Sequence, residues 1–399
     1  MSASTSAGHA SSRARAPIVF YISSHGFGHA VREIEILNQL QPVLGASGAA
    51  HTIVLRTAAD PWLLDRALRV PVERMPAEVD TGIVQIDSLR LDERATFAKA
   101  RDFYATFDAR ARDEADLLRA LEARLVVSDI APLGFEAAHR AHVPSLGISN
   151  FTWDWIYEGY PEHAAHAGMV ISTIRVAYRK ATRALRLPMH GGFDTFPIIE
   201  DIPFIARHAA RAREDVRAAL GIPPHRPAVL ASFGAYGVET LAEGSIDCLP
   251  AWTLVVSNRT MRQTSREGRE ADWRGRAASG GDNSVVHVSE DDLYARGFRY
   301  EDLVGAVDAV LTKPGYGIVS ECIANGTAML YTSRGRFPEY DVFVREMPRY
   351  LRCAYISPLD LGAGRWRTAL EEAVSQPQPG AVRTDGADVA VAKIMEMLG

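Results

Sequence analysis

The chain has 399 residues, which is enough for two or three domains with sizeable hydrophobic cores. Apolar residues make up 47% of it and charged residues 23%, as in an ordinary globular protein. The net charge is −5, and no concentrated basic face of the kind that nucleic-acid binders carry is visible, so no nucleic-acid partner is expected.

Cysteine usage and hydropathy point to the cytoplasm. The three cysteines, Cys248, Cys322 and Cys353, lie far apart and form neither a Cys-x-x-Cys pair nor a zinc pattern, so we expect reduced thiols. No stretch approaches the ~18 consecutive apolar residues of a transmembrane helix. Residues 1–16 are small and polar and lack the apolar core of a secretory signal, so we expect a disordered tail there.

Short apolar runs alternate with helical patterns along the rest of the chain. Each run is nearly continuous, which is typical of a strand buried on both faces of a parallel sheet. The runs form two series: Ile18–Ser23, Ile53–Thr57, Leu125–Asp129 and Ser145–Ser149, and then Ala228–Phe233, Leu254–Ser257, Val285–Val288, Ala309–Thr312 and Ala328–Thr332.

Amphipathic stretches separate these runs. Gly28–Leu40 has an apolar residue at every third position from Val31, and we expect this helix to stop at Pro42. Charges follow one side of Leu91–Arg124, which predicts one long helix or two helices in series. Tyr316–Asn325 gathers apolar residues on one face and is followed by a glycine, a good helix end.

This alternation in two series predicts an α/β protein with two doubly wound, Rossmann-like domains. Proline and glycine are frequent over residues 188–227, between the two series. We therefore expect an N-terminal domain over 17–190, a linker over 191–226 and a C-terminal domain over 227–399. Ligands bind at the carboxyl ends of the strands in such domains, so the cleft between the two sheets is the expected site.

A glycine-containing turn follows the first expected strand. Gly26 and Gly28 allow the backbone to bend tightly and to approach a ligand beside the free N–H groups of the next helix. A dehydrogenase that binds a nicotinamide dinucleotide is an alternative. Its fingerprint would need a small residue where Val31 stands and an acidic residue where the second strand ends at Arg56.

Two histidines flank these glycines. Imidazole titrates near neutral pH, so His25 or His29 could take a proton from an attacking hydroxyl. His25, which directly follows the strand end, is preferred over His29, and Asp129 at another strand end is the next candidate base. The alternatives are that the histidines bind the acceptor or hold the loop through hydrogen bonds.

A second glycine turn follows the strand Ala309–Thr312. Gly315 and Gly317 precede a helix whose N–H groups and dipole form an anion site, and Lys313 adds a full charge there. Glu321, in the first two turns of this helix, could accept hydrogen bonds from a vicinal diol such as ribose. The alternative is an ordinary turn with a surface glutamate.

Two further turns reach the expected cleft. After the strand Ala328–Thr332, Arg334 and Arg336 could bind phosphate and Glu339 could bind sugar hydroxyls, unless this is only a solvated charged loop. Gly234, after the opening strand of the second series, offers another close approach of the backbone.

Together these residues resemble the GT-B glycosyltransferases. The similar groups are the peptidoglycan N-acetylglucosaminyltransferases, bacterial predicted glycosyltransferases and, more closely, the N-terminal part of plant L-arabinokinases. The resemblance covers residues 17 to about 375. It rests on three strings: Ser24-His25-Gly26-Phe27-Gly28-His29-Ala30, Val126-Val127-Ser128-Asp129, and Asn150-Phe151-Thr152-Trp153-Asp154-Trp155-Ile156-Tyr157.

The resemblance implies a GT-B fold, with the acceptor bound mainly by the N-terminal domain and the nucleotide sugar mainly by the C-terminal domain. The residues implied on the acceptor side are Gly26, Gly28, Asn150, Trp153 and Asp154. Those implied for the diphosphate, ribose and sugar of the donor are Gly315, Gly317, Ser320, Glu321 and Glu339. The sequence departs from the family at Tyr340, where glutamine often follows the acidic residue, and it has no counterpart of the arabinokinase phosphate loop.

The expected function is transfer of a sugar from a nucleoside diphosphate sugar to the hydroxyl or amine of an unidentified acceptor. The chain has no Asp-x-Asp motif at a strand end and no metal-ligand spacing, so neither a metal nor another cofactor is expected. Direct displacement with one base inverts the anomeric centre. A nucleotide-sugar epimerase of the same fold and a non-catalytic nucleotide-sugar-binding module remain alternatives.

Overall fold

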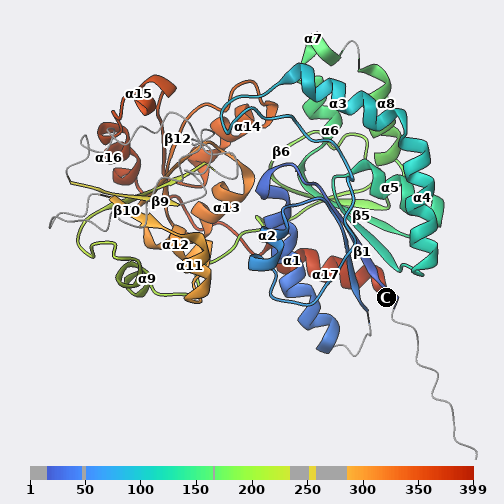
Figure 1. The fold of residues 1–399 in the computed structure, drawn as a ribbon, viewed down its shortest axis with the longest axis horizontal. Helices are drawn as coiled ribbons and strands as arrows, with labels where there is room; N and C mark the ends of the chain where they lie inside the picture. Colours follow the sequence, from blue (N-terminus) through green and yellow to red (C-terminus); the bar gives the residue numbers. More distant parts are fainter. Residues whose placement is uncertain (1–15, 47–50, 165–166, 234–250, 258–284) are drawn as a thin grey trace, which may run out of the picture.

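The computed structural model describes residues 16–46, 51–164, 167–233, 251–257 and 285–399. Within these residues the chain forms two lobes, each built on one parallel sheet with helices on its faces (Figure 1). The α/β class and the two doubly wound sheets are as predicted. The predicted donor residue Gly234 and the cysteine Cys248 lie outside the described residues.

The sheet of the first lobe has the order β3-β2-β1-β4-β5-β6-β7 in the described part of the chain, and all its pairings are parallel. Its strands are β1 (Ile18–Ile22), β2 (Ile53–Arg56), β3 (Glu73–Arg74), β4 (Leu125–Asp129), β5 (Ser145–Phe151), β6 (Arg183–Gly191) and β7 (Ile199–Asp201). The strand order reverses between β1 and β4, so a crevice opens beyond their carboxyl ends.

The sheet of the second lobe repeats this plan, with the order β10-β9-β8-β11-β12-β13 among the described residues and all pairings parallel. Its strands are β8 (Ala228–Ser232), β9 (Thr253–Ser257), β10 (Val285–Val288), β11 (Ala309–Thr312), β12 (Ala328–Tyr331) and β13 (Cys353–Tyr355). Here the order reverses between β8 and β11. Each lobe thus offers one switch point to a ligand.

Helices cover the faces of both sheets (Figure 1). The helices from the first half of the chain are α1 (Gly26–Ala46), α2 (Pro61–Ala67), α3 (Glu93–Ala105), α4 (Phe107–Ala120), α5 (Pro132–Ala141), α6 (Trp153–Glu158), α7 (Pro161–Ala164) and α8 (Gly168–Tyr178). The others are α9 (Arg213–Leu220), α11 (Glu290–Ala295), α12 (Tyr300–Ala306), α13 (Tyr316–Asn325), α14 (Pro338–Glu346), the 3₁₀ helix η4 (Met347–Arg349), α15 (Pro358–Gly362), α16 (Arg367–Ser375) and α17 (Gly386–Leu398).

The first helix differs from its predicted bounds. α1 runs from Gly26 to Ala46 and continues through Pro42, so the prediction that this proline ends the helix was wrong. A proline inside a helix removes one backbone hydrogen bond. Leu44, in the turn after the proline, is buried in the core of the first lobe, and this burial holds the last turn in place.

The stretch Leu91–Arg124 folds as the second of its two predicted forms. α3 and α4 follow one another, and Thr106 both ends the first and precedes the second. Their buried faces meet an aromatic cluster of the first lobe that contains Phe103, Phe107 and Tyr157.

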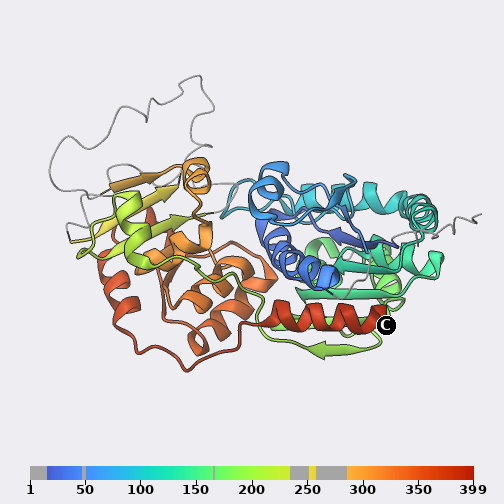
Figure 2. The ribbon, with the colours of Figure 1, turned by 90° about the horizontal axis from the view of Figure 1, so that it is seen from below.

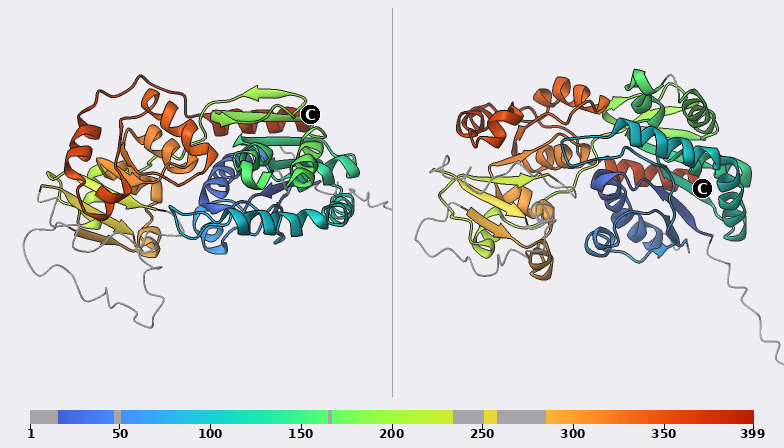
Figure 3. Two further views of the ribbon diagram at one scale, coloured as in Figure 1. Left: turned by 90° about the horizontal axis from the view of Figure 1, so that it is seen from above. Right: turned by 45° about the horizontal axis from the view of Figure 1, so that its top comes forward.

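The chain passes between the lobes twice. β7 lies within the stretch predicted as a linker and completes the first sheet, after which α9 and β8 begin the second lobe. At the other end of the chain, α17 returns to the first lobe and packs against α1. Figure 2 and Figure 3 show α17 beside the β6–β7 edge, where Lys393 lies 2.7 Å from Glu200.

Candidate functional site

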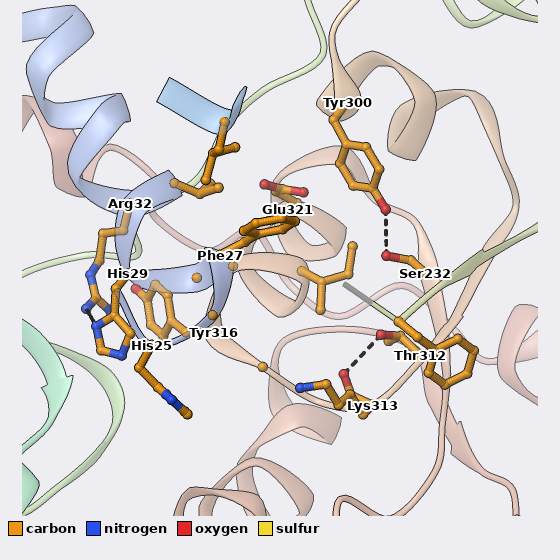
Figure 4. Close-up of a pocket in the computed structure, with 18 of the residues that line it drawn as sticks. His25, Phe27, His29, Arg32, Ser232, Tyr300, Thr312, Lys313, Tyr316 and Glu321 are labelled. Atoms are coloured by element: carbon orange, nitrogen blue, oxygen red, sulfur yellow. Dashed lines mark hydrogen bonds between the residues drawn. The ribbon is translucent and has the colours of Figure 1, made fainter. Parts of the chain in front are cut away.

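A cleft between the lobes is lined by loops that follow the strands at both switch points. The first lobe contributes His25, just before α1, and the second contributes Ser232 at the end of β8 and Lys313 and Tyr316 after β11 (Figure 4). The predicted placement of these turns at the carboxyl edges of two sheets therefore brings them to one cavity.

The two glycine turns face each other at close range. A Cβ atom at Gly317 would lie 3.6 Å from Cα of Gly28, and a Cβ at Gly28 would lie 3.9 Å from the backbone nitrogen of Gly317. Gly26 has a positive φ of 68°, which favours glycine and allows the bend into α1. The N-termini of α1 and α13 thus approach one another, and the free N–H groups and dipoles at such helix ends favour anions.

His29 and Asp129 form a buried pair at the first-lobe side of this cleft. Nδ1 of His29 lies 2.8 Å from Oδ2 of Asp129. Although burial alone would raise the pKa of Asp129, the neighbouring Arg32 and His29 lower it below its ordinary value, so the carboxyl is ionised. An ionised carboxylate can only accept hydrogen bonds, so Nδ1 of His29 carries a proton, and in the neutral form of the ring Nε2 holds the lone pair.

Arg32 joins this pair to the second lobe. Its guanidinium donates to the second oxygen of Asp129 and, over 3.1 Å, to Oδ1 of Asn150. Nδ2 of Asn150 donates to Oε1 of Glu339 over 2.7 Å, across the cleft. A continuous chain of buried polar groups therefore runs from His29 to Glu339, the carboxylate that the family resemblance predicts to bind the donor sugar.

In His25, unlike in His29, Nδ1 accepts a hydrogen bond. Nδ1 of His25 accepts from the backbone N–H of Ile83 over 3.2 Å. A backbone nitrogen can only donate, so the proton of neutral His25 sits on Nε2. Burial, followed by the charges of Arg334, His29 and Lys313, lowers the pKa of His25 well below its ordinary value.

Two basic side chains, Arg334 and Lys313, lie on the second-lobe side. Nη1 of Arg334 donates to Oε2 of Glu339 over 3.2 Å, and its guanidinium carbon lies 4.0 Å from the ring centre of Phe337. Burial, and then the charge of Arg334, lowers the pKa of Lys313 well below its ordinary value. Arg334, Lys313 and Glu339 all line the cleft.

At the other end of the cleft, Glu321 is held by an arginine that the sequence analysis missed. Nε of Arg207 donates to Oε1 of Glu321 over 2.7 Å, and Nη2 of Arg207 donates to the same oxygen. Nη1 of Arg207 lies 3.2 Å from Oε2 of Glu301, behind the cleft. Nearby, the hydroxyl groups of Ser232 and Tyr300 lie 2.5 Å apart (Figure 4).

Several predicted site residues do not line the cleft. Asp129 lies behind His29, and Ser320 is buried with its hydroxyl donating to the carbonyl of Gly317 over 3.0 Å. Arg336 extends outward, with 60% of its side chain exposed, and lies 3.9 Å from Glu93.

The aromatic string of the sequence is also buried rather than facing a ligand. Trp153 is 1% exposed and donates from Nε1 to Oδ2 of Asp80 over 3.0 Å. Asp154 accepts from Nε of Arg175 over 3.0 Å, away from the cleft. The prediction that Trp153 and Asp154 line the acceptor side is therefore wrong, because α6 turns both side chains into the first lobe. Asn150 does line the cleft.

Among the site residues that the sequence did not predict, only Arg32 could have been recognised from its neighbours in the sequence. Arg32 lies three residues after His29, which on a helix places both on one face. Arg207 and Ile83 reach the site through long-range folding, and nothing in the residues around them indicates it. Among the described residues, no group of three or more His, Cys, Asp or Glu side chains is arranged to hold a metal ion. In the same part of the chain, no helix is long and apolar enough to cross a membrane.

Comparison with known proteins follows this geometry. No model of a known protein family matches the sequence. The chain is 27% identical to L-arabinokinase from Arabidopsis thaliana over 362 residues, which are 89% of this chain and 32% of that protein. The chain thus spans about a third of the length of this relative. The predicted resemblance to plant L-arabinokinases is confirmed by this match.

Solved structures match almost the whole chain. The calicheamicin glycosyltransferase CalG4 matches with a TM-score of 0.58 and 16% identity, covering 96% of this chain and 98% of that one. The glycotransferase of kitacinnamycin matches with a TM-score of 0.58, 17% identity and coverage of 96% and 100%. Arabidopsis thaliana UGT89C1 complexed with UDP matches with a TM-score of 0.53, 13% identity and coverage of 96% and 100%. The chain therefore has the GT-B fold of the glycosyltransferases, as the sequence predicted.

Proposed function

We propose that the protein transfers a sugar from a nucleoside diphosphate sugar to a hydroxyl or amine of an acceptor. The observation that carries this proposal is the His29–Asp129 pair, which faces the N-terminus of α13 and Lys313 across one cleft. A base on one side and an anion site on the other are the two parts that such a transfer needs. The fold, shared with the calicheamicin glycosyltransferase CalG4 and with UGT89C1 complexed with UDP, supports this assignment.

His29 is the base in this proposal. Its Nε2 holds the free lone pair, whereas the corresponding nitrogen of His25 holds a proton. The acceptor oxygen or nitrogen gives its proton to Nε2 of His29 as it bonds to the anomeric carbon. The bond from that carbon to the diphosphate oxygen breaks, and its electron pair leaves with the diphosphate. Asp129 orients the ring and stabilises the imidazolium that forms.

The leaving diphosphate is stabilised by the N–H groups at the start of α13, near Gly315 and Gly317, and by Lys313. We propose that these groups replace a divalent cation and that no cofactor takes part. Displacement in a single step inverts the anomeric centre. The buried free thiols of Cys322 and Cys353 suit a reducing compartment, so the cytoplasm is the proposed location.

A ligand and turnover experiment tests this function. A nucleoside diphosphate at 100 times its Kd should stabilise the protein by about 2.7 kcal/mol. With a nucleotide sugar and an acceptor library, His29→Ala should lower kcat by about 10²–10⁴-fold and leave nucleotide affinity near normal. The matched control is His190→Ala, which removes an exposed histidine outside the cleft.

Three outcomes would overturn parts of the proposal. The absence of stabilisation by any nucleoside diphosphate would remove its basis. Epimerised sugar released from the donor without an acceptor would identify an epimerase instead. Complete loss of activity with EDTA, restored by Mg²⁺ or Mn²⁺, would contradict the metal-independent mechanism.

A further inference from the structure

A turn at Asp80–Ile83 lies directly behind His25, and two sequence strings that are distant from it fix its first residue. Oγ of Ser23 donates to Oδ1 of Asp80 over 3.0 Å, and Nε1 of Trp153 donates to Oδ2 over 3.0 Å. The ring of Trp153 also packs edge-on against His25, with 5.4 Å between the ring centres. Trp153 therefore holds both the ring of His25 and the start of the turn behind it.

Helix α6, which carries Trp153, also fixes the middle of the Asp80–Ile83 turn. The hydroxyl of Tyr157 donates to the carbonyl of Gly82 over 3.1 Å and lies 2.8 Å from Oγ1 of Thr81. Trp153 and Tyr157 are four residues apart on α6, so they lie on one face of that helix. One helical face thus holds both the start and the middle of the turn.

Gly82 allows this turn to reach His25. Its φ is 56°, and a Cβ atom built there would lie 2.7 Å from Cβ of His25. Any other residue would therefore be strained and would collide with the histidine. The close approach brings the N–H of Ile83 to 3.2 Å from Nδ1 of His25. The backbone thus occupies Nδ1 as an acceptor and leaves the proton on Nε2.

Nε2 of His25 is buried and has no hydrogen-bond partner in the described part of the chain. The charged or titratable groups that act on this ring are Arg334, His29, Lys313 and Lys99, and all of them lower the pKa of His25 in addition to the effect of burial. His25 therefore stays neutral near pH 7 and presents an N–H rather than a lone pair.

Two neighbouring basic side chains add further hydrogen-bond donors. Among the described residues, Nε of Arg334 is buried without a hydrogen-bond partner, and Lys313 lies close enough to Arg334 and Glu339 to feel the charge of both. Glu339 is the carboxylate that accepts from Arg334. Figure 4 shows Lys313 extending toward the side of the cleft where His25 lies. The three donor groups line one cleft.

We propose that His25 is a neutral hydrogen-bond donor to an anionic oxygen of the nucleotide sugar, and that the Asp80–Ile83 turn holds its proton on Nε2 for this purpose. Arg334 supplies positive charge at the same place, and Lys313 supplies further N–H donors. The proposal rests on the function proposed above. The oxygen belongs either to the diphosphate or to a carboxylate on the sugar, since both present the same chemistry.

Two amide substitutions at His25 distinguish the role of Nε2 from that of Nδ1. In His25→Gln the amide nitrogen reaches the position of Nε2, whereas in His25→Asn it reaches only that of Nδ1. We expect His25→Gln to bind within about threefold of wild type and His25→Asn to bind about tenfold more weakly, the loss of one hydrogen bond to a charged group. Calorimetry with UDP, UDP-glucose and UDP-glucuronate identifies the oxygen.

If His25→Asn loses affinity for UDP itself, the oxygen belongs to the diphosphate. If it loses affinity only for UDP-glucuronate, the oxygen belongs to the sugar carboxylate. Equal affinity of the two variants for all three ligands would overturn the proposal. So would a wild-type affinity that rises on acidification from pH 8 to 6 and loses that rise in His25→Gln, because the histidine would then bind as a cation.

A second measurement needs neither ligand nor turnover. Long-range ¹H–¹⁵N spectra of histidine-labelled protein, with His25→Gln used to assign the signal, should show a neutral ring protonated on Nε2 from pH 6 to 8. A proton on Nδ1 of His25, or an imidazolium between pH 6 and 8, would refute the proposal that the turn keeps the proton on Nε2. If the spectra agree and no nucleotide binds, the proposed function fails while the tautomer assignment stands.

Discussion

Asp80 shows how one residue in the support of the site affects stability. Burial raises the pKa of its carboxyl to about 6, although His29, Ser23 and Trp153 act in the opposite direction. In the unfolded chain an aspartate titrates near about 3.9. Between about pH 4 and 6 the folded protein therefore binds more protons than the unfolded chain. Stability falls as the pH rises through this window, by on the order of 2–3 kcal/mol in total.

Asp80→Asn should remove this dependence, because an amide does not titrate and still offers one oxygen to Ser23 or Trp153. The free energy of unfolding, measured with urea from pH 4 to 7, should fall more steeply with pH in wild type than in the variant. Parallel curves for the two proteins would show that Asp80 titrates normally in the folded state.

The two histidines also show what single residues reveal in a sequence. Their types and their place beside a glycine turn predicted that they lie at the cleft, and both do. Their different protonation patterns could not be predicted, because the deciding partners are Asp129 on another strand and Ile83 on a distant turn. The interpretation of Trp153 as a ligand contact failed for the same reason, since its partner Asp80 has no signature of its own.

At the scale of elements, α13 connects the proposed anion site to a buried ion cluster. Glu321 faces the cleft from this helix, and Arg207 lies between Glu321 and Glu301. Glu321→Gln should weaken nucleotide binding about tenfold, because a ligand hydroxyl would lose a charged acceptor. Titration calorimetry with a nucleoside diphosphate measures this effect.

Glu301→Gln is the matched control for that substitution. It removes the other carboxylate beside Arg207, and Glu301 does not line the cleft. Both variants should lower the melting temperature, but only Glu321→Gln should change the affinity. An equal loss of affinity in the two variants would mean that Glu321 acts through Arg207 alone.

Strands differed in how well their sequences revealed them. The central strands β1, β4 and β8 are buried along their whole length, so each reads as a continuous apolar run. β3 is two residues long and exposed, and β6 contains two arginines and a proline, so neither has that pattern. Edge strands such as β7 and β13 are fixed by pairing with a neighbour, which local composition does not record.

At the scale of the whole molecule, α17 contributes to the stability of the first lobe although it comes last in the chain. Ile394 on this helix is fully buried in the core that contains α1. Ile394→Ala should destabilise the protein by about 2–5 kcal/mol. Hydrogen exchange should rise in α1 more than in α16 of the second lobe.

Glu396→Ala removes an exposed side chain from the same helix and serves as the control. It should leave exchange in α1 nearly unchanged. Faster exchange in α16 than in α1 for Ile394→Ala would show that the helix stabilises the second lobe instead.

The return of α17 has a consequence for biosynthesis. β7 ends at Asp201 and α17 begins at Gly386, so a ribosome must add the whole second lobe before the first lobe can be completed. At about 5–20 residues per second this delay is roughly 10–40 s. During that time the apolar surface of α1 that α17 covers stays available to chaperones or to other nascent chains. A fusion or truncation at the carboxyl terminus would therefore disturb the packing of the first lobe, although that lobe is synthesised before the second.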